Sequence, residues 1–148
     1  KGLSNCRWPG RLEVLNRNPD IIIDGAHNED GMKNLIKFLN ENVDSNKKII
    51  FLLSILKDKN YKSMLKTIRT LPNDLELLIT TNQNKRSIDP QIIAKEANLL
   101  NIKYKVINDL YDCMKEAKNI INDSDLLCIT GSLYTVSEAR FYHSVLFK

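Results

Sequence analysis

Short apolar runs and longer segments with helical spacing alternate along this chain. Five such runs, with many β-branched residues, lie at residues 21–23, 49–53, 75–81, 104–107 and 126–130. Their apolar positions are continuous rather than alternating, as in strands that are buried on both faces of a parallel sheet. The pattern therefore predicts five buried strands.

Segments whose apolar residues recur at helical spacing follow these runs. We expect helices at residues 32–39, 61–68, 91–100, 110–121 and 133–146. Asp89 and Pro90 form an N-cap followed by proline at the first helical position, and Asp109 is placed to cap the next helix. The beginnings of two of the five helices are thus marked by the sequence.

Five repeats of strand and helix, joined by short connections, favour one fold class. They predict an α/β, Rossmann-like three-layer domain, with a mostly parallel sheet of five or six strands and helices on both faces. Residues 11–15 are expected to add an antiparallel strand at an edge. Because no internal linker is visible, we interpret residues 1–148 as one domain. The chain begins with Lys1 rather than Met and shows no secretory signal, so we expect it to be a piece of a longer protein.

Composition narrows the classes of function. The 148 residues include 22 basic and 18 acidic side chains, a net charge of +4. The lysines are dispersed, without the basic stripe and interleaved aromatic residues of a nucleic-acid-binding surface. The longest apolar run, residues 49–55, is interrupted by Ser54 and is far shorter than the roughly 20 residues of a membrane span. Three cysteines without a CxxC pattern favour a reducing compartment. We expect no nucleic-acid or membrane partner, and a cytoplasmic location, or an organelle in a eukaryote.

The loop after the first run contains the residues Asp24-Gly25-Ala26-His27-Asn28. Ligands of open α/β sheets bind beyond the carboxyl ends of the strands, where an aspartate can accept hydrogen bonds from ribose hydroxyls. His27 and Asn28 lie next to a helix N-terminus, which attracts anions. The alternative is that Asp24 and Asn28 cap the helix and that His27 is a solvated loop residue.

Two later loops carry groups that suit an anionic ligand. Lys57 or Lys59, in the loop after the second run, could neutralise a phosphate or carboxylate. Gly131 and Ser132 offer backbone N–H groups and a hydroxyl at the start of the last helix. The alternatives are a polar turn capped by Asp58 in the first loop and a plain serine N-cap in the second.

The segment Arg7-Trp8-Pro9-Gly10-Arg11 contains the single tryptophan of the chain. Arg11 could bind a nucleotide phosphate through its bidentate guanidinium group. Alternatively, Trp8 packs on the domain and the arginines are solvated. The sequence has no GxxxxGK[ST] phosphate loop and no GxGxxG, GxSxG or HExxH motif. The chain alone therefore lacks the residues that bind and transfer a phosphoryl group.

Four motifs in order carry a resemblance: Arg-Trp-Pro-Gly-Arg, Asp-Gly-Ala-His-Asn, Leu-x-Asp-Lys and Thr-Gly-Ser-Leu-Tyr. Together they resemble the C-terminal domain of folylpolyglutamate synthase/dihydrofolate synthase, a family of the Mur ligase superfamily. The resemblance extends from Arg7 to about Arg140. The chain departs from the usual family pattern at Glu29, where proline is common, and in the loop around Lys59.

The resemblance implies an ATP-dependent ligase. ATP would phosphorylate a carboxylate of folate or dihydropteroate, and the amine of L-glutamate would attack the acyl phosphate to give an amide. The phosphate loop and the Mg²⁺ ligands would lie in an N-terminal ATPase domain that this chain lacks, its expected partner. The chain alone is therefore expected to be inactive.

The resemblance also implies roles for individual residues. The expected ATP-binding residues are Arg11, Asp24 and His27. The expected glutamate-binding residues are Lys59, Ser132 and, more weakly, Asn28. No catalytic residue is identified, and no metal ligand is expected within this domain. Two alternatives stay open: another Mur-type amino-acid ligase, and a non-catalytic α/β domain for nucleotide sensing or protein interaction.

Overall fold

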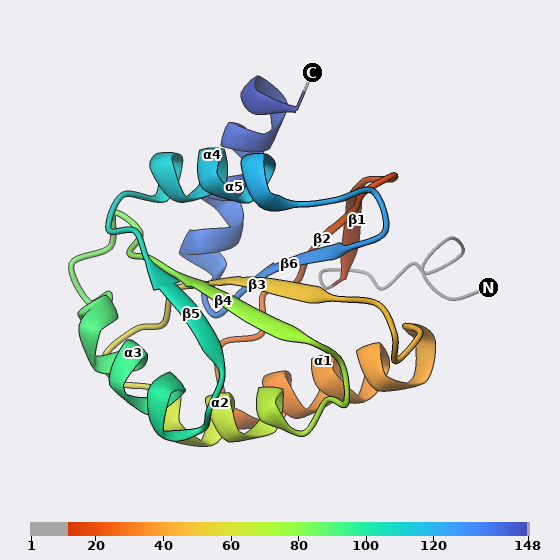
Figure 1. The fold of residues 1–148 in the computed structure, drawn as a ribbon. Helices are drawn as coiled ribbons and strands as arrows, with labels where there is room; N and C mark the ends of the chain where they lie inside the picture. The colour runs from red at the N-terminus through yellow and green to blue at the C-terminus, as the bar shows by residue number, and fades with distance from the viewer. Residues whose placement is uncertain (1–11, 148) are drawn as a thin grey trace.

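A six-stranded sheet forms the centre of the computed structural model, which describes residues 12–147 (Figure 1). The strands, in their order across the sheet, are β1 (Glu13–Asn16), β2 (Asp20–Ile23), β6 (Leu126–Thr130), β3 (Ile49–Leu53), β4 (Leu75–Ile79) and β5 (Lys103–Val106). β1 is antiparallel to β2, and all other neighbours are parallel. The predicted α/β fold class and the additional antiparallel edge strand are both confirmed.

Helices cover both faces of the sheet. They are α1 (Glu29–Asn42), α2 (Tyr61–Arg69), α3 (Pro90–Leu99), α4 (Leu110–Ile120) and α5 (Leu133–Leu146). α1, α2 and α3 lie on one face, and α4 and α5 lie on the other (Figure 1). Asp89 and Asp109 accept hydrogen bonds from backbone N–H groups in the first turns of α3 and α4, so both predicted N-caps are confirmed.

The central strand β3 shows why the apolar runs are continuous. Ile49, Phe51 and Leu53 pack with α1, α2 and α3, whereas Ile50 and Leu52 pack with α4 and α5. All five side chains are completely buried. A strand between two helical layers needs apolar residues at every position, because both of its faces are removed from water.

One predicted buried strand is largely exposed, and that prediction was wrong. β5 lies at the edge of the sheet and pairs only with β4. Tyr104 is 40% exposed, and Lys103 and Lys105 are exposed on either side of it. Lysine side chains on an edge strand discourage pairing with a second chain. The predicted strand at residues 75–81 is also shorter, because β4 ends at Ile79.

No helix within residues 12–147 has the length and apolar character needed to cross a membrane.

Candidate functional site

The loops that follow β2 and β6 are joined at the carboxyl edge of the sheet. The backbone N–H of Asp24 donates to the carbonyl of Ile129 at 3.0 Å, and that of Gly131 donates to the carbonyl of Ala26 at 3.0 Å. These contacts bring the first predicted loop against the last one. Two of the motifs singled out in the sequence therefore form one surface.

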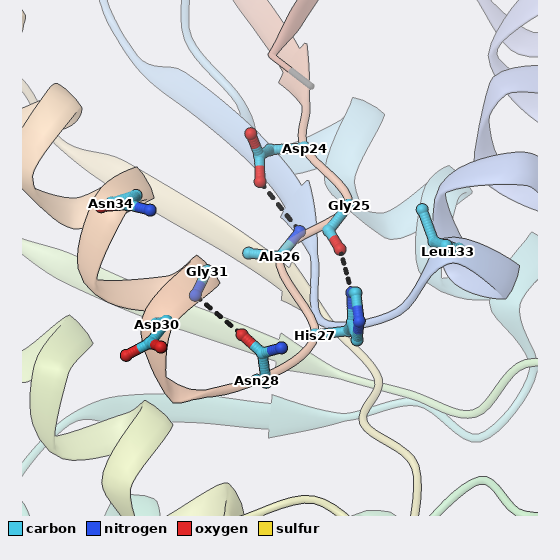
Figure 2. Close-up of a pocket in the computed structure, with 9 residues that line it drawn as sticks. All are labelled: Asp24, Gly25, Ala26, His27, Asn28, Asp30, Gly31, Asn34 and Leu133. Atoms are coloured by element: carbon cyan, nitrogen blue, oxygen red, sulfur yellow. Dashed lines mark hydrogen bonds between the residues drawn. The ribbon is translucent and has the colours of Figure 1, made fainter. Parts of the chain in front are cut away.

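Asp24 takes part in a local turn at the end of β2. Its side chain is 6% exposed, and its Oδ1 accepts from the N–H of Ala26 at 2.8 Å. Nδ1 of His27 lies 2.9 Å from the carbonyl oxygen of Gly25, which fixes the orientation of the ring (Figure 2). Asp24 and His27 are thus rigidly placed at the end of β2.

Asn28 forms the N-cap of α1. Its Oδ1 accepts from the N–H of Gly31 at 2.8 Å (Figure 2). The capping alternative for this loop therefore holds for Asn28, whereas Oδ1 of Asp24 accepts a hydrogen bond from within its own loop. Asparagine is among the residues preferred at this position, because its side-chain oxygen satisfies a free N–H of the first turn.

A pocket of about 360 Å³ opens beside this loop, and we call it the first pocket. Figure 2 shows the residues that line it: Asp24, Gly25, Ala26, His27, Asn28, Asp30, Gly31, Asn34 and Leu133. None of these described residues is a lysine or an arginine, and two of them are aspartates. The lining favours a ligand part that donates hydrogen bonds over one that is strongly anionic.

The loops after β3 and β4 pair with each other. The N–H of Lys57 donates to the carbonyl of Arg86 at 2.7 Å, and the N–H of Ile88 donates to that of Ile55 at 2.8 Å. This short antiparallel pairing holds the two loops together along the carboxyl edge. It brings Arg86 close to the loop that carries Lys59, although 26 residues separate the two in sequence.

A smaller pocket of about 180 Å³, the second pocket, lies between these paired loops and the start of α5. Its lining consists of His27, Leu56, Asp58, Lys59, Arg86, Ser132, Leu133 and Tyr134. The carboxylate of Asp58 lies 4.0 Å from Nζ of Lys59 and 3.9 Å from Nη1 of Arg86. Two cations therefore flank this pocket, with one carboxylate between them.

Asp58 does not cap α2, so the alternative of a turn capped by Asp58 was wrong. The N-cap is Asn60, whose Oδ1 accepts from the N–H of Ser63 at 3.1 Å. The carboxylate of Asp58 is instead directed to the two cations.

Ser132 belongs to the lining of the second pocket, and Gly131 precedes it at the end of β6. Ser132 is 1% exposed and caps α5, with its Oγ accepting from the N–H of Tyr134 at 3.1 Å. Gly131 has a φ of 107°, and a Cβ at this position would lie 2.4 Å from the carbonyl oxygen of Ser54. Only glycine fits so close to the backbone of the neighbouring loop.

The structure groups the predicted site residues in a way the sequence did not. Asp24, His27 and Asn28 line the first pocket, whereas Lys59 and Ser132 line the second, which His27 also reaches. Asn28, predicted to bind glutamate, therefore lies with the predicted ATP-binding residues. Arg11 lies outside the described residues.

The sequence analysis missed Arg86. Its signal was available only indirectly, because it lies in the loop after the third predicted strand, residues 75–81, at the same carboxyl edge of the sheet. The pairing of this loop with residues 54–60 decides its place, and that pairing is a tertiary contact. Within residues 12–147, no cluster of three or more His, Cys, Asp or Glu side chains could hold a metal ion.

Comparisons with known proteins identify the family of the chain. Residues 10–133 match the family described as "Mur ligase, glutamate ligase domain". The chain is 30% identical to dihydrofolate synthase/folylpolyglutamate synthase of Bacillus subtilis, over 94% of the chain and 31% of that protein. It is 23% identical to the UDP-N-acetylmuramoyl-L-alanyl-D-glutamate–2,6-diaminopimelate ligase of Clostridium botulinum, over 83% of the chain and 26% of that ligase.

Solved structures show the same fold. Folylpolyglutamate synthase of Mycobacterium tuberculosis, complexed with ADP and AMPPCP, is 26% identical with a TM-score of 0.79, over 93% of this chain and 33% of that one. E. coli FolC in complex with DHPP and ADP has a TM-score of 0.83 at 16% identity, over 99% of this chain and 34% of that one. The chain thus spans about a third of the length of these two proteins and of the Bacillus subtilis relative. It belongs to the Mur ligase family, as a glutamate ligase domain.

Proposed function

We propose that this chain is the part of an ATP-dependent ligase that binds the amino acid and contributes to the nucleotide site. The complete ligase would join L-glutamate to folate or dihydropteroate. The observation that carries the proposal is the pair of pockets, which differ in charge and share His27 and Leu133. The family and the names of the relatives support it.

The first pocket is proposed to take the nucleoside end of ATP. The buried carboxylate of Asp24 accepts hydrogen bonds, as ribose hydroxyls require, and the glycine backbone beside it permits close approach. The lining described here offers no cation for the phosphates. We propose that Arg11, which precedes β1, supplies one.

The second pocket is proposed to take the carboxylates of glutamate. Lys59 and Arg86 provide positive charge, and Ser132 marks the N-terminus of α5, where backbone N–H groups favour anions. Asp58 lies beside both cations and partly neutralises them. A bound carboxylate would compete with Asp58 for the same two partners.

The residues of this chain would contribute to the reaction by positioning the substrates. ATP would transfer its γ-phosphoryl group to the acceptor carboxylate, releasing ADP. The glutamate amine would then attack the acyl phosphate, releasing phosphate and leaving an amide. Residues of the second pocket would hold the amino acid so that its amine faces the reacting carbon, and closure would exclude water from the acyl phosphate.

The phosphate loop and the Mg²⁺ ligands are proposed to belong to an N-terminal ATPase region outside this chain. The relatives, about three times longer than the chain, support this division. A cytoplasmic location fits the two cysteines of residues 12–147, Cys113 and Cys128, which are both buried and unpaired.

A second candidate is a ligase that adds another dicarboxylic amino acid to a peptidoglycan precursor. The diaminopimelate ligase of Buchnera aphidicola, 31% identical over 90% of this chain and 28% of that protein, favours it. The two cations of the second pocket would suit either amino acid.

The test is phosphate release by the complete ligase, this chain together with its ATPase region. We expect release only when ATP, dihydropteroate or a folate, and L-glutamate are all present, and we expect Asp24→Ala and Arg11→Ala to reduce it. Release with a UDP-muramoyl peptide and diaminopimelate instead would favour the second candidate. If neither set of substrates caused ATP consumption, a non-catalytic domain would be the correct interpretation.

A further inference from the structure

We infer that Asn82 is a positioning residue that holds the three segments around the second pocket in fixed positions relative to one another. It lies in the loop between β4 and α3 and is 9% exposed. It is not among the residues that line either pocket. The inference rests on the proposed role of the second pocket and assigns a function to a residue outside it.

The carbonyl end of the Asn82 side chain secures the loop that carries Arg86. Oδ1 of Asn82 accepts from the N–H of Asn84 at 2.8 Å, and Oδ1 of Asn84 accepts from the N–H of Arg86 at 2.8 Å. Two successive side-chain turns of this kind fix the backbone conformation locally. The position of the Arg86 backbone therefore depends, in two steps, on Asn82.

The amide end of Asn82 reaches the other two walls. Nδ2 donates to Oγ1 of Thr135 at 3.0 Å and approaches Oγ of Ser54 at 3.4 Å. Thr135 lies in the first turn of α5, three residues after Ser132, and Ser54 begins the loop that leads to Lys59. One side chain thus connects the segments that carry all three polar groups of the proposed glutamate site.

Burial makes this connection difficult for water to replace. Ser54 and Thr135 are both completely buried. Removing the amide would take one hydrogen-bond partner from each of these two buried hydroxyls, which favours a rearrangement of the surrounding backbone.

The expected rearrangement separates α5 from the paired loops. Oγ of Ser54 lies 3.0 Å from Oγ of Ser87, so the loops after β3 and β4 keep a tie of their own when Asn82 is changed. Between α5 and these loops, the hydrogen bond from the N–H of Gln83 to Oε2 of Glu138 at 2.8 Å and the contact of 3.5 Å from the Thr135 hydroxyl to the Ser54 carbonyl would remain. The start of α5, which carries Ser132, should therefore shift relative to Lys59 and Arg86, while the next turn of the helix stays attached to the loop after β4.

The first pocket should be much less affected. Its loop is held by the contact between Gly131 and Ala26 and by the turn at Asp24, neither of which includes Asn82. A substitution at Asn82 should thus change the KM for the amino acid and leave the KM for ATP almost unchanged. A general loss of stability would not separate the two constants.

The experiment is steady-state kinetics of the complete ligase with ATP and L-glutamate varied in turn. For Asn82→Ala we expect the glutamate KM to rise about 10-fold, since small misplacements of binding groups have effects of this size or larger. The ATP KM should stay within about 2-fold of wild type. Thr135→Val, which removes the hydroxyl but keeps the shape of the side chain, should also raise the glutamate KM.

Thr135→Ser keeps the hydroxyl and should leave the glutamate KM near the wild-type value. If Asn82→Ala does not fold, the comparison of Thr135→Val with Thr135→Ser provides the test.

Asn73 provides a matched control. It is 6% exposed, and its Nδ2 donates to the carbonyls of Asp44 at 2.9 Å and Lys47 at 2.8 Å. These residues precede β3 and β4 and thus lie at the amino ends of the strands, away from both pockets. Asn73→Ala should lower the thermal unfolding midpoint without changing the ratio of the two KM values.

Two outcomes would contradict the positioning role of Asn82, and a third would contradict the proposed function of the second pocket itself. A glutamate KM at the wild-type level in both Asn82→Ala and Thr135→Val, while Lys59→Met raises it, would refute the positioning role alone. Equal rises of both KM values, as in a general loss of stability, would refute it as well. If Lys59→Met also left the glutamate KM unchanged, the proposed function of the second pocket would be wrong.

Discussion

The two pockets share His27 and Leu133 and yet differ in charge. Among described lining residues, the first has aspartates and neither lysine nor arginine, whereas the second has Lys59 and Arg86 around a single aspartate. We propose that this sheet edge offers neighbouring places for a hydroxyl-rich group and for a carboxylate. A ligase that must bring a nucleotide and an acidic amino acid together needs such a division.

The pockets also differ in how they are built. The first is shaped by turns within one loop, where Ala26 bonds to Asp24 and Gly31 bonds to Asn28. The second depends on contacts between distant segments, such as that between Asn82 and Thr135, which are 53 residues apart. A local turn forms from its own sequence, whereas the second pocket exists only when the whole carboxyl edge is assembled.

The largest expected effect is on stability and comes from Gly131, whose backbone contacts the loop after β2 and lies close to the loop after β3. Gly131→Ala places a Cβ 2.4 Å from a backbone oxygen at a positive φ, so we expect a loss of about 3 kcal/mol in the free energy of unfolding. Gly25→Ala is the control, because its Cβ would meet only the side chain of Leu133, which is 59% exposed and free to rotate. Urea unfolding measures both. Equal losses would show that the backbone contact at Gly131 is not decisive.

A smaller effect is expected from the cation that the sequence analysis missed. Arg86→Met should raise the glutamate KM about 10-fold, because a charge-assisted hydrogen bond to a carboxylate is lost. The ATP KM should not change, since Arg86 does not line the first pocket. Lys85→Met, a change of a neighbouring exposed cation, is the control and should alter neither constant. A rise confined to the ATP KM would reverse the proposed assignment of the pockets.

Removing the carboxylate of Asp58 should increase the difference in charge between the two pockets. Asp58→Asn frees Lys59 and Arg86 from their competing partner, so we expect the glutamate KM to fall about 2-fold, as suits an exposed ion pair. Asp30→Asn, a similar change at the first pocket, should leave the glutamate KM as it is. An increase in the glutamate KM of Asp58→Asn would mean that Asp58 itself contacts the amino acid.

The sequence predicted the fold because its signals are local. Continuous apolar runs mark strands between two helical layers, and Asp89 and Asp109 mark helix beginnings through contacts within their own turns. β5 was misjudged because a short run such as residues 104–107 does not reveal that it lies at an edge. Exposure at an edge depends on strand order, which is a tertiary property.

The sequence predicted those residues of the candidate site that belong to short local motifs, and it missed the residues that tertiary contacts place there. Asp24, Lys59 and Ser132 each end or follow a strand, and all three lie at the pockets. Arg86 and Asn82 were missed because their places depend on loop pairing and on a contact with α5. The misplaced cap at Asp58 shows the same limit on a smaller scale, since Asn60 is an equally good cap two residues away.

The smallest expected effect lies on α5, away from both pockets. Burial lowers the pKa of His143, whose Nε2 has no partner within the described structure and whose ring stacks on Phe147 at 4.9 Å. Because folding disfavours the protonated form, stability should fall as the pH drops below the ordinary histidine value of about 6.5 and be unaffected above it.

We expect a slightly smaller decrease in the thermal unfolding midpoint between pH 7.5 and pH 5.5 for His143→Phe than for wild type, with unchanged KM values. An identical decrease in the two proteins would show that other groups dominate the acid dependence.

The most direct test of the two-pocket assignment compares Asp24→Ala with Lys59→Met in the complete ligase, measuring both KM values for each variant. The proposal predicts that Asp24→Ala raises the KM for ATP and not that for glutamate, and that Lys59→Met does the reverse. If both variants raised the KM of the same substrate, the division of the carboxyl edge into a nucleotide pocket and an amino-acid pocket would be contradicted.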